Sequence, residues 1–147
     1  MCLIVDVNIA HKVFLATDNP DFKDVHKALF TDNKPIASIV YGGKLVDEYA
    51  RNSQIIRVLA QLDRTGRARK VDDDLIRKEM ETVVQINLCQ SNDEHIIALA
   101  RIGKVRVLCS HDKALHTDFT NKKLIDKPRG KVYQKSKHVK LLWRFCN

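Results

Sequence analysis

The chain lacks several sequence features that would assign it to a protein class at once. Its four cysteines form no Cys-x-x-Cys pair, which argues against a structural zinc site. No apolar run approaches the roughly 20 residues that cross a membrane, and no basic N-terminal region precedes an apolar segment with a cleavage site. We therefore expect a cytoplasmic protein in which Cys2 and Cys109, both inside apolar runs, are reduced and buried thiols.

Acidic residues are in deficit. The 18 Asp and Glu residues face 26 Lys and Arg residues, so the formal net charge is +8. This surplus favours a polyanionic partner, nucleic acid first, because each phosphate that a protein neutralises releases counterions. With 147 residues, 44% of them hydrophobic, the chain suits one globular domain over residues 1–147 and is too short for two. It contains no internal repeat and no low-complexity linker.

The first apolar run carries the most informative polar residues. Residues 2–7 are rich in β-branched types and predict a buried strand, which delivers Asp6 and Asn8 at its carboxyl end. Ligand sites of open parallel sheets form at that edge. Asp6 is therefore a candidate for metal or phosphate chemistry, and the alternative is that it only caps the helix that follows.

Strand-like and helix-like segments alternate along the rest of the chain. This alternation predicts an α/β fold in which a central, mainly parallel sheet lies between two layers of helices. The expected further strands cover 36–41, 68–71, 105–110, 131–133 and 139–142. The expected helices cover 9–15, 22–30, 44–62 as one long helix stopped by Gly66, 75–84, 113–119, and a segment from Ser91 to Gly103.

Four acidic residues fall at one edge of this predicted sheet. Asp6 and Asp112 follow strands, whereas Glu48 and Asp93 lie where helices begin. Carboxylates gathered in one pocket repel one another unless a cation offsets their charge. Oxygen ligands together with water select a hard ion such as Mg²⁺ or Mn²⁺. Such a site suits metal-assisted hydrolysis of a phosphodiester bond.

The order of these residues resembles that of the PIN-domain ribonucleases. The resemblance spans Met1 to about Phe119. It is carried by four motifs: Asp6-Val7-Asn8 after an apolar strand, Glu48-Tyr49 on a helix, Asp93 opening a helix with a small and apolar face, and Ser110-His111-Asp112 after an apolar strand.

The resemblance implies an α/β/α sandwich and an endonuclease that cuts single-stranded or structured RNA with Mg²⁺ or Mn²⁺. Asp6, Glu48, Asp93 and Asp112 would be the catalytic and metal-binding residues, and Asn8 or Ser110 would orient a ligand or a phosphate. Many bacterial relatives are toxins, so a cognate antitoxin protein is an expected partner, and so is a second copy of the chain.

One position departs from the family pattern. Many members place another acid two residues after the last Asp, where this chain has Ala114. Asp118 lies six residues after Asp112 and does not share its helical face. The number of metal ions, one or two, therefore stays open.

Several other residues have competing interpretations. Asp72, Asp73 and Asp74 favour helix capping over metal binding, because adjacent carboxylates on a helix point in different directions. The family pattern favours Glu48 over its neighbour Asp47. Three histidines invite a transition-metal or general-base interpretation, which we rank below a structural one: His95, His111 and His116.

The basic C-terminal segment at about 120–147 suits a surface that follows a phosphate backbone. The candidate RNA-binding residues are Arg51, Lys131, Lys135 and Lys137. Aromatic side chains in the same segment either stack on bases or tie a terminal strand to the sheet, and these are Tyr133, Trp143 and Phe145. The competing function is a non-catalytic RNA-binding or protein-interaction domain with a vestigial acidic pocket.

Overall fold

The computed structural model describes residues 1–146 and contains one sheet of five strands in the order β3-β2-β1-β4-β5. All four neighbouring pairs are parallel. The parallel α/β prediction is therefore confirmed. The strands are β1 (Leu3–Val5), β2 (Ile39–Tyr41), β3 (Ala68–Lys70), β4 (Val107–Cys109) and β5 (Lys131–Tyr133).

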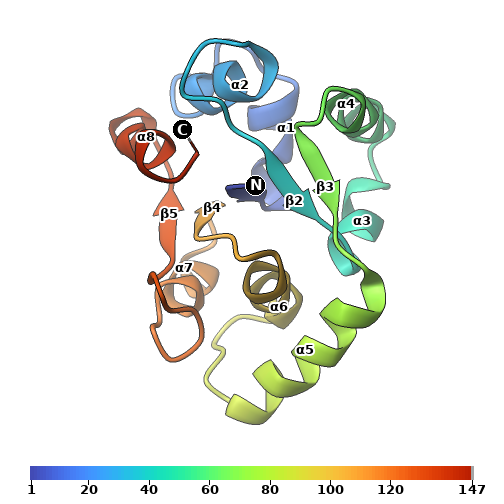
Figure 1. The fold of residues 1–147 in the computed structure, drawn as a ribbon, viewed down its shortest axis with the longest axis vertical. Coiled ribbons are helices and arrows are strands. Elements are labelled where there is room, and N and C mark those ends of the chain that lie inside the picture. The colour runs from blue at the N-terminus through green and yellow to red at the C-terminus, as the bar shows by residue number, and fades with distance from the viewer. Residues whose placement is uncertain (147) are drawn as a thin grey trace.

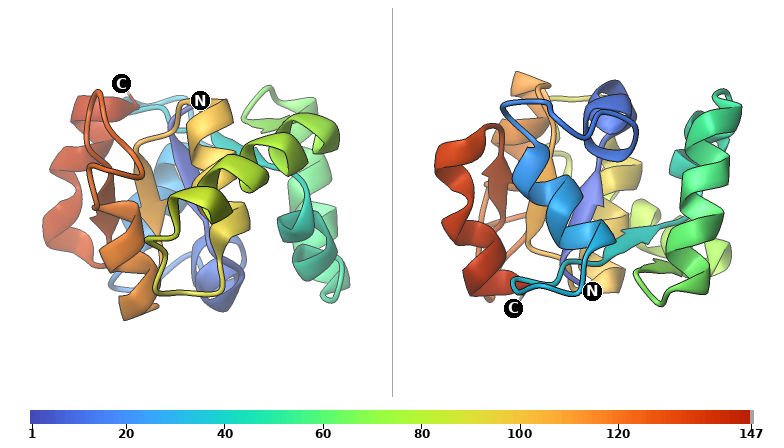
Figure 2. Two further views of the ribbon diagram at one scale, coloured as in Figure 1. Left: turned by 90° about the horizontal axis from the view of Figure 1, so that it is seen from below. Right: turned by 90° about the horizontal axis from the view of Figure 1, so that it is seen from above.

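Helices cover both faces of the sheet. Figures 1 and 2 show α1 and α2 on one face and α6 and α7 on the other, with α5 packed outside α6, while α3 with α4 and α8 flank the two edges. The predicted three-layer sandwich is thus confirmed. The helices are η1 (Val7–Ile9), α1 (Ala10–Phe14), α2 (Lys23–Phe30), α3 (Lys44–Tyr49), α4 (Ser53–Arg64), α5 (Asp73–Ile86), α6 (Glu94–Gly103), α7 (Lys113–Phe119), η2 (Ser136–His138) and α8 (Lys140–Phe145).

The strand order explains which residues the sequence makes apolar. Every residue of β1, β2 and β4 is buried, since these strands lie inside the sheet with helices on both faces. In the edge strand β3 only Ala68 is buried, and Arg69 and Lys70 face solvent. The continuous apolar runs of the sequence therefore mark the centre of the sheet.

The order also creates a switch point between β1 and β4. From β1 the chain builds β2 and β3 to one side, then crosses to the other side of β1 to form β4 and β5. The connections leaving β1 and β4 diverge at their carboxyl ends, where open α/β sheets bind ligands. Asp6 lies at this point, and its backbone N–H donates to the carbonyl oxygen of Cys109 at 2.9 Å.

Two predicted elements are wrong. The segment 44–62 forms two helices, because the side chain of Asn52 accepts hydrogen bonds from the N–H groups of Gln54 and Ile55 and so starts α4 anew. The segment 139–142 belongs to a helical end of the chain and not to a strand. In α8 the side chain of Leu142 points inward, and Trp143 is 51% exposed.

The cysteine prediction is half right. Cys109 is a free, fully buried thiol. Cys2, however, forms a disulfide with Cys146, because α8 returns to the amino end of β1 and brings the two Cα atoms to 5.2 Å. The two residues are 144 positions apart, so sequence spacing gives no sign of their approach. Across residues 1–146, no helix combines the length and the apolar character needed to cross a membrane.

Candidate functional site

Asp6 is buried at the switch point and is not used as a helix cap. It occupies the N-cap position of η1, yet its side chain makes no capping hydrogen bond. Instead its Oδ2 accepts a hydrogen bond from the Ser110 hydroxyl at 2.7 Å. The alternative interpretation of Asp6 as a simple cap is therefore wrong.

The pKa of Asp6 is raised above its ordinary value, first by burial and then by the negative charges of Asp93, Glu48 and Asp112, while the Ser110 hydrogen bond lowers it. The three carboxylates come from distant parts of the chain, and all act on the same buried group. The fold therefore brings these three charges close enough to act on Asp6, and their convergence on one ion stays a prediction.

Ser110 links the ends of β1 and β4. It is completely buried, and its hydroxyl oxygen also accepts the N–H of Asp112 at 3.0 Å. Asp112 in turn caps α7, because its Oδ1 accepts the N–H of Leu115 at 3.1 Å. One carboxylate oxygen of Asp112 is therefore occupied by the helix.

Glu48 reaches the site from α3. Its side chain is 16% exposed, and its Oε1 lies 2.8 Å from Nε2 of His95. The hydroxyl of the neighbouring Tyr49 donates to the carbonyl oxygen of Val5, which anchors α3 to the end of β1. Asp47 is exposed, so the placement agrees with the choice of Glu48.

The turn before α3 requires glycine. Gly42 has φ +154°, and a Cβ atom there would lie 2.8 Å from the backbone oxygen of Val71. This close approach lets the chain pass from β2 directly into α3, which then presents Glu48 at the sheet edge.

Asp93 stands at the N-terminus of α6 and, like Asp6, makes no capping hydrogen bond with its side chain. Burial is the largest cause of its raised pKa, and the charges of Asp112 and Glu48 add to it, whereas those of His95 and Lys44 lower it. Its side chain is 26% exposed, so Asp93 is open to solvent while lying among the other acids.

Asp118 holds the loop that carries Asp93. It is 1% exposed, its Oδ1 accepts the N–H of Gln90 at 2.8 Å, and its Oδ2 accepts the hydroxyl of Ser91 at 2.6 Å. The Ser91 hydroxyl oxygen then accepts the N–H of Asp93 at 3.3 Å. Asp118 therefore shapes the site without facing it, as its spacing from Asp112 predicted.

Carboxylate oxygens are the donors that hard ions such as Mg²⁺ prefer. Nowhere in residues 1–146 do three His, Cys, Asp or Glu side chains form a ready-made metal-binding group. Mg²⁺ keeps several of its waters and commonly uses one or two carboxylates together with substrate phosphates. The oxygen donors of this site fit that kind of binding.

The other predicted site residues lie at different distances from this edge. Asn8 is exposed on η1, and Arg51, Lys135 and Lys137 are also exposed. Lys131 is half-buried and begins β5 at the level of Val107, which is the amino end of the sheet. Lys131 is therefore the least suited of these residues to contact a ligand beside Asp6.

His95 is the residue that the sequence interpretation undervalued. It is 3% exposed, with Nε2 against Glu48 and Nδ1 4.0 Å from Oδ1 of Asp93. The sequence offered one indication of this role: His95 lies two residues after Asp93, in the first turn of the same helix. That spacing alone does not reveal a contact with a different helix.

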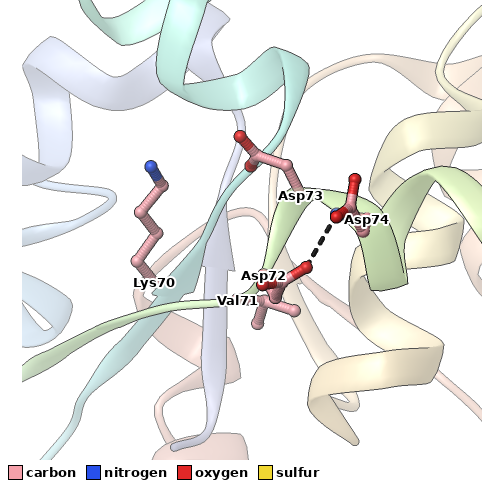
Figure 3. A pocket seen from close by; sticks show the side chains of 5 residues that line it. All are labelled: Lys70, Val71, Asp72, Asp73 and Asp74. Atoms are coloured by element: carbon pink, nitrogen blue, oxygen red, sulfur yellow. Dashed lines mark hydrogen bonds between the residues drawn. The ribbon is translucent and has the colours of Figure 1, made fainter.

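The consecutive acids Asp72, Asp73 and Asp74 form a separate surface. Together with Lys70 and Val71 they line a pocket of about 530 Å³ (Figure 3), which none of the four convergent carboxylates lines. Asp72 caps α5 by accepting the N–H groups of Asp74 and Leu75, so the capping prediction is confirmed for this residue.

Comparison with known proteins adds no assignment: no protein-family model, no curated protein and no solved structure matches this chain.

Proposed function

We propose that this protein is a PIN-like, metal-dependent endoribonuclease that hydrolyses RNA phosphodiester bonds with Mg²⁺ or Mn²⁺. The observation that carries the proposal is the state of Asp6 and Asp93. Both carboxylates stand at helix N-cap positions without capping, and each has a raised pKa because of burial and of the other acids nearby.

The cost of this arrangement supports a bound cation. Burial disfavours the charged form of a carboxylate, and additional like charges increase the penalty, so that the pKa of Asp6 is raised despite its hydrogen bond from Ser110. Asp6 and Asp93 could each lower that cost by capping a helix, yet neither does. A divalent ion between the carboxylates would offset the repulsion that the fold maintains.

Asp6, Glu48, Asp93 and Asp112 are the residues that would hold the ion. When bound there, Mg²⁺ or Mn²⁺ would supply a Lewis acid for the phosphate oxygens and lower the pKa of a coordinated water. The hydrogen bond from Ser110 fixes one oxygen of Asp6, and α7 engages one oxygen of Asp112.

Asp93 is the proposed acceptor for the proton of the attacking water. Its side chain is more exposed than that of Asp6, so a water molecule can reach its carboxylate. Its backbone is held through the Ser91 and Asp118 contacts, which keeps this carboxylate at the sheet edge.

RNA is the proposed substrate because the chain carries a net charge of +8 around a small acidic site. Lys44 begins α3 and is close enough for its charge to act on Asp93. Exposed Arg51, Lys135 and Lys137 would contact the phosphate backbone away from the ion. The basic surface would equally suit an acidic antitoxin, and we propose that protein and a second copy of the chain as further partners.

The proposal is tested by an assay for cleavage of an end-labelled single-stranded RNA at neutral pH. We expect cleavage with Mn²⁺, none in excess EDTA, and recovery when Mn²⁺ is restored. The variant D6N should bind the RNA and leave it intact. Cleavage that persists in excess EDTA would overturn the proposal, and salt-sensitive binding without any cleavage by the wild type would favour the non-catalytic alternative.

A further inference from the structure

A buried histidine connects two of the four carboxylates. His95 lies in the first turn of α6, two residues after Asp93, and its side chain is only 3% exposed. Its Nε2 is 2.8 Å from Oε1 of Glu48, a side chain that arrives on a different helix, α3. Because an ionised carboxylate only accepts hydrogen bonds, Nε2–H must be the donor.

This contact engages Oε1 of Glu48, so the ion would be held through the other oxygen, Oε2. Glutamate loses substantial rotamer freedom when it is immobilised, so a carboxylate without a partner would sample several positions. Glu48 is 16% exposed and therefore has room to move toward solvent. The other three acids are held differently: Asp6 by Ser110, Asp112 by α7, and Asp93 through the backbone of its loop.

We propose that His95 is a positioning residue that fixes Glu48 for binding of the divalent ion. The inference rests on the proposed function, because it assigns His95 a role toward the ion that Asp6, Glu48, Asp93 and Asp112 would hold. Partners that orient a metal-binding side chain typically change metal affinity by about 10–100-fold when they are removed. His95 acts through Glu48 and is not itself assigned contact with the ion or the RNA.

Two substitutions separate this role from simple packing. In H95Q the amide Nε2 is the same number of bonds from the backbone as Nε2 of histidine, so it can still donate to Glu48. In H95N the amide nitrogen corresponds to Nδ1 of histidine, so the donor is too short to reach Glu48. Both variants replace the imidazole ring by a neutral amide, and they differ only in whether the amide nitrogen can reach Glu48.

The quantity to measure is the affinity for Mn²⁺ in the absence of RNA. The electron paramagnetic resonance signal of free Mn²⁺ reports how much of the ion remains unbound. We expect H95N to bind Mn²⁺ about 10–100-fold more weakly than the wild type, and H95Q to remain within about threefold of it. Circular dichroism and thermal unfolding in EDTA check that both variants fold. Should H95N fail to fold, H95Q decides alone, since a loss of affinity there contradicts the proposal.

The double variant with E48Q tests whether His95 acts through Glu48. If it does, H95N weakens Mn²⁺ binding when Glu48 is intact. In the E48Q background, H95N should change the Mn²⁺ affinity by less than about twofold. Equal affinity for the wild type and H95N, or full additivity with E48Q, overturns the role of His95. A wild-type protein that binds no Mn²⁺ overturns the metal-dependent function as well, so the two failures are distinguishable.

Discussion

The molecule holds two groups of acidic side chains that are built in opposite ways. Asp72, Asp73 and Asp74 are consecutive, and each has a partner within the protein: Asp72 caps α5, Asp73 Oδ1 accepts the N–H of Gly43 at 3.0 Å, and Asp74 pairs with Arg77. The four convergent carboxylates come instead from four segments separated by up to about a hundred positions, and they act on one another.

The difference shows that acidic residues adjacent in the sequence need not form a ligand site, whereas acidic residues far apart in the sequence can act on one another. Three exposed neighbours on one helix turn reach backbone donors and an arginine, so their charges are accounted for without a ligand. Asp6 and Asp93 are brought together by the switch point of the sheet, and burial and repulsion raise the pKa of each. Only in the second arrangement do burial and neighbouring carboxylates disfavour the charged form of each acid.

The largest expected contrast is in RNA cleavage. D93N should lower the rate by at least about 100-fold, since it removes a charge that acts on the reacting groups. D73N should leave the rate within about twofold, because Asp73 only braces the turn before α3. Single-turnover assays on a labelled RNA measure both rates. Similar losses in the two variants would remove the distinction between the two acidic groups.

Stabilisation of the folded protein by Mn²⁺ should depend on Asp93 and not on Asp72. Mn²⁺ at 100 times its Kd should add about 2.7 kcal/mol to the free energy of unfolding of the wild type. D72N should gain a similar amount, while D93N should gain little. Thermal unfolding with and without Mn²⁺ gives the three shifts, and a full shift in D93N would contradict the site.

Loss of a cap should have a smaller effect that does not depend on metal. D72A removes the acceptor for the N–H groups of Asp74 and Leu75 and should cost about 1 kcal/mol of stability. The loss should be the same in Mn²⁺ and in EDTA. Urea unfolding measures it, and a loss seen only with Mn²⁺ would place Asp72 at a metal site.

The smallest expected effect is a gain in the stability of the D6N variant at neutral pH. The pKa of Asp6 is raised in the folded state, so as pH rises from its ordinary value of 3.8 the unfolded carboxyl group loses its proton first. Stability therefore falls until the folded pKa is passed. The neutral amide of the D6N variant avoids that loss and can still accept the Ser110 hydrogen bond.

In EDTA at pH 7, D6N should thus melt above the wild type. The advantage should vanish below pH 3.8, where both states of the wild type are protonated. Thermal unfolding across this pH range tests the sign, and a D6N protein that is less stable at pH 7 would contradict the electrostatic account.

Much of the architecture could be predicted from the sequence because the apolar runs are unambiguous. The helix at 113–119 and the strand at 131–133 match α7 and β5 in both bounds. The positions of Asp6 and Asp112 after buried strands follow from the same patterns, and parallel strands place their carboxyl ends together. The sequence could therefore predict that Asp6 and Asp112 lie at the same edge of the sheet.

The remaining features depend on contacts between distant segments. The break at Asn52 interrupts a periodic apolar stripe that continues through it, so periodicity alone merges α3 with α4. The link from His95 to Glu48 joins two helices, and the disulfide from Cys2 to Cys146 joins the two ends of the chain. None of these contacts leaves a local spacing pattern.

The most direct test of the central claim is anomalous diffraction from crystals soaked in Mn²⁺. If Asp6, Glu48, Asp93 and Asp112 hold one ion, as we propose, a strong anomalous peak should appear beside Asp6, within coordination distance of carboxylate oxygens from Asp93 or Glu48. A peak beside Asp72–Asp74, with none at the carboxyl ends of β1 and β4, would contradict it.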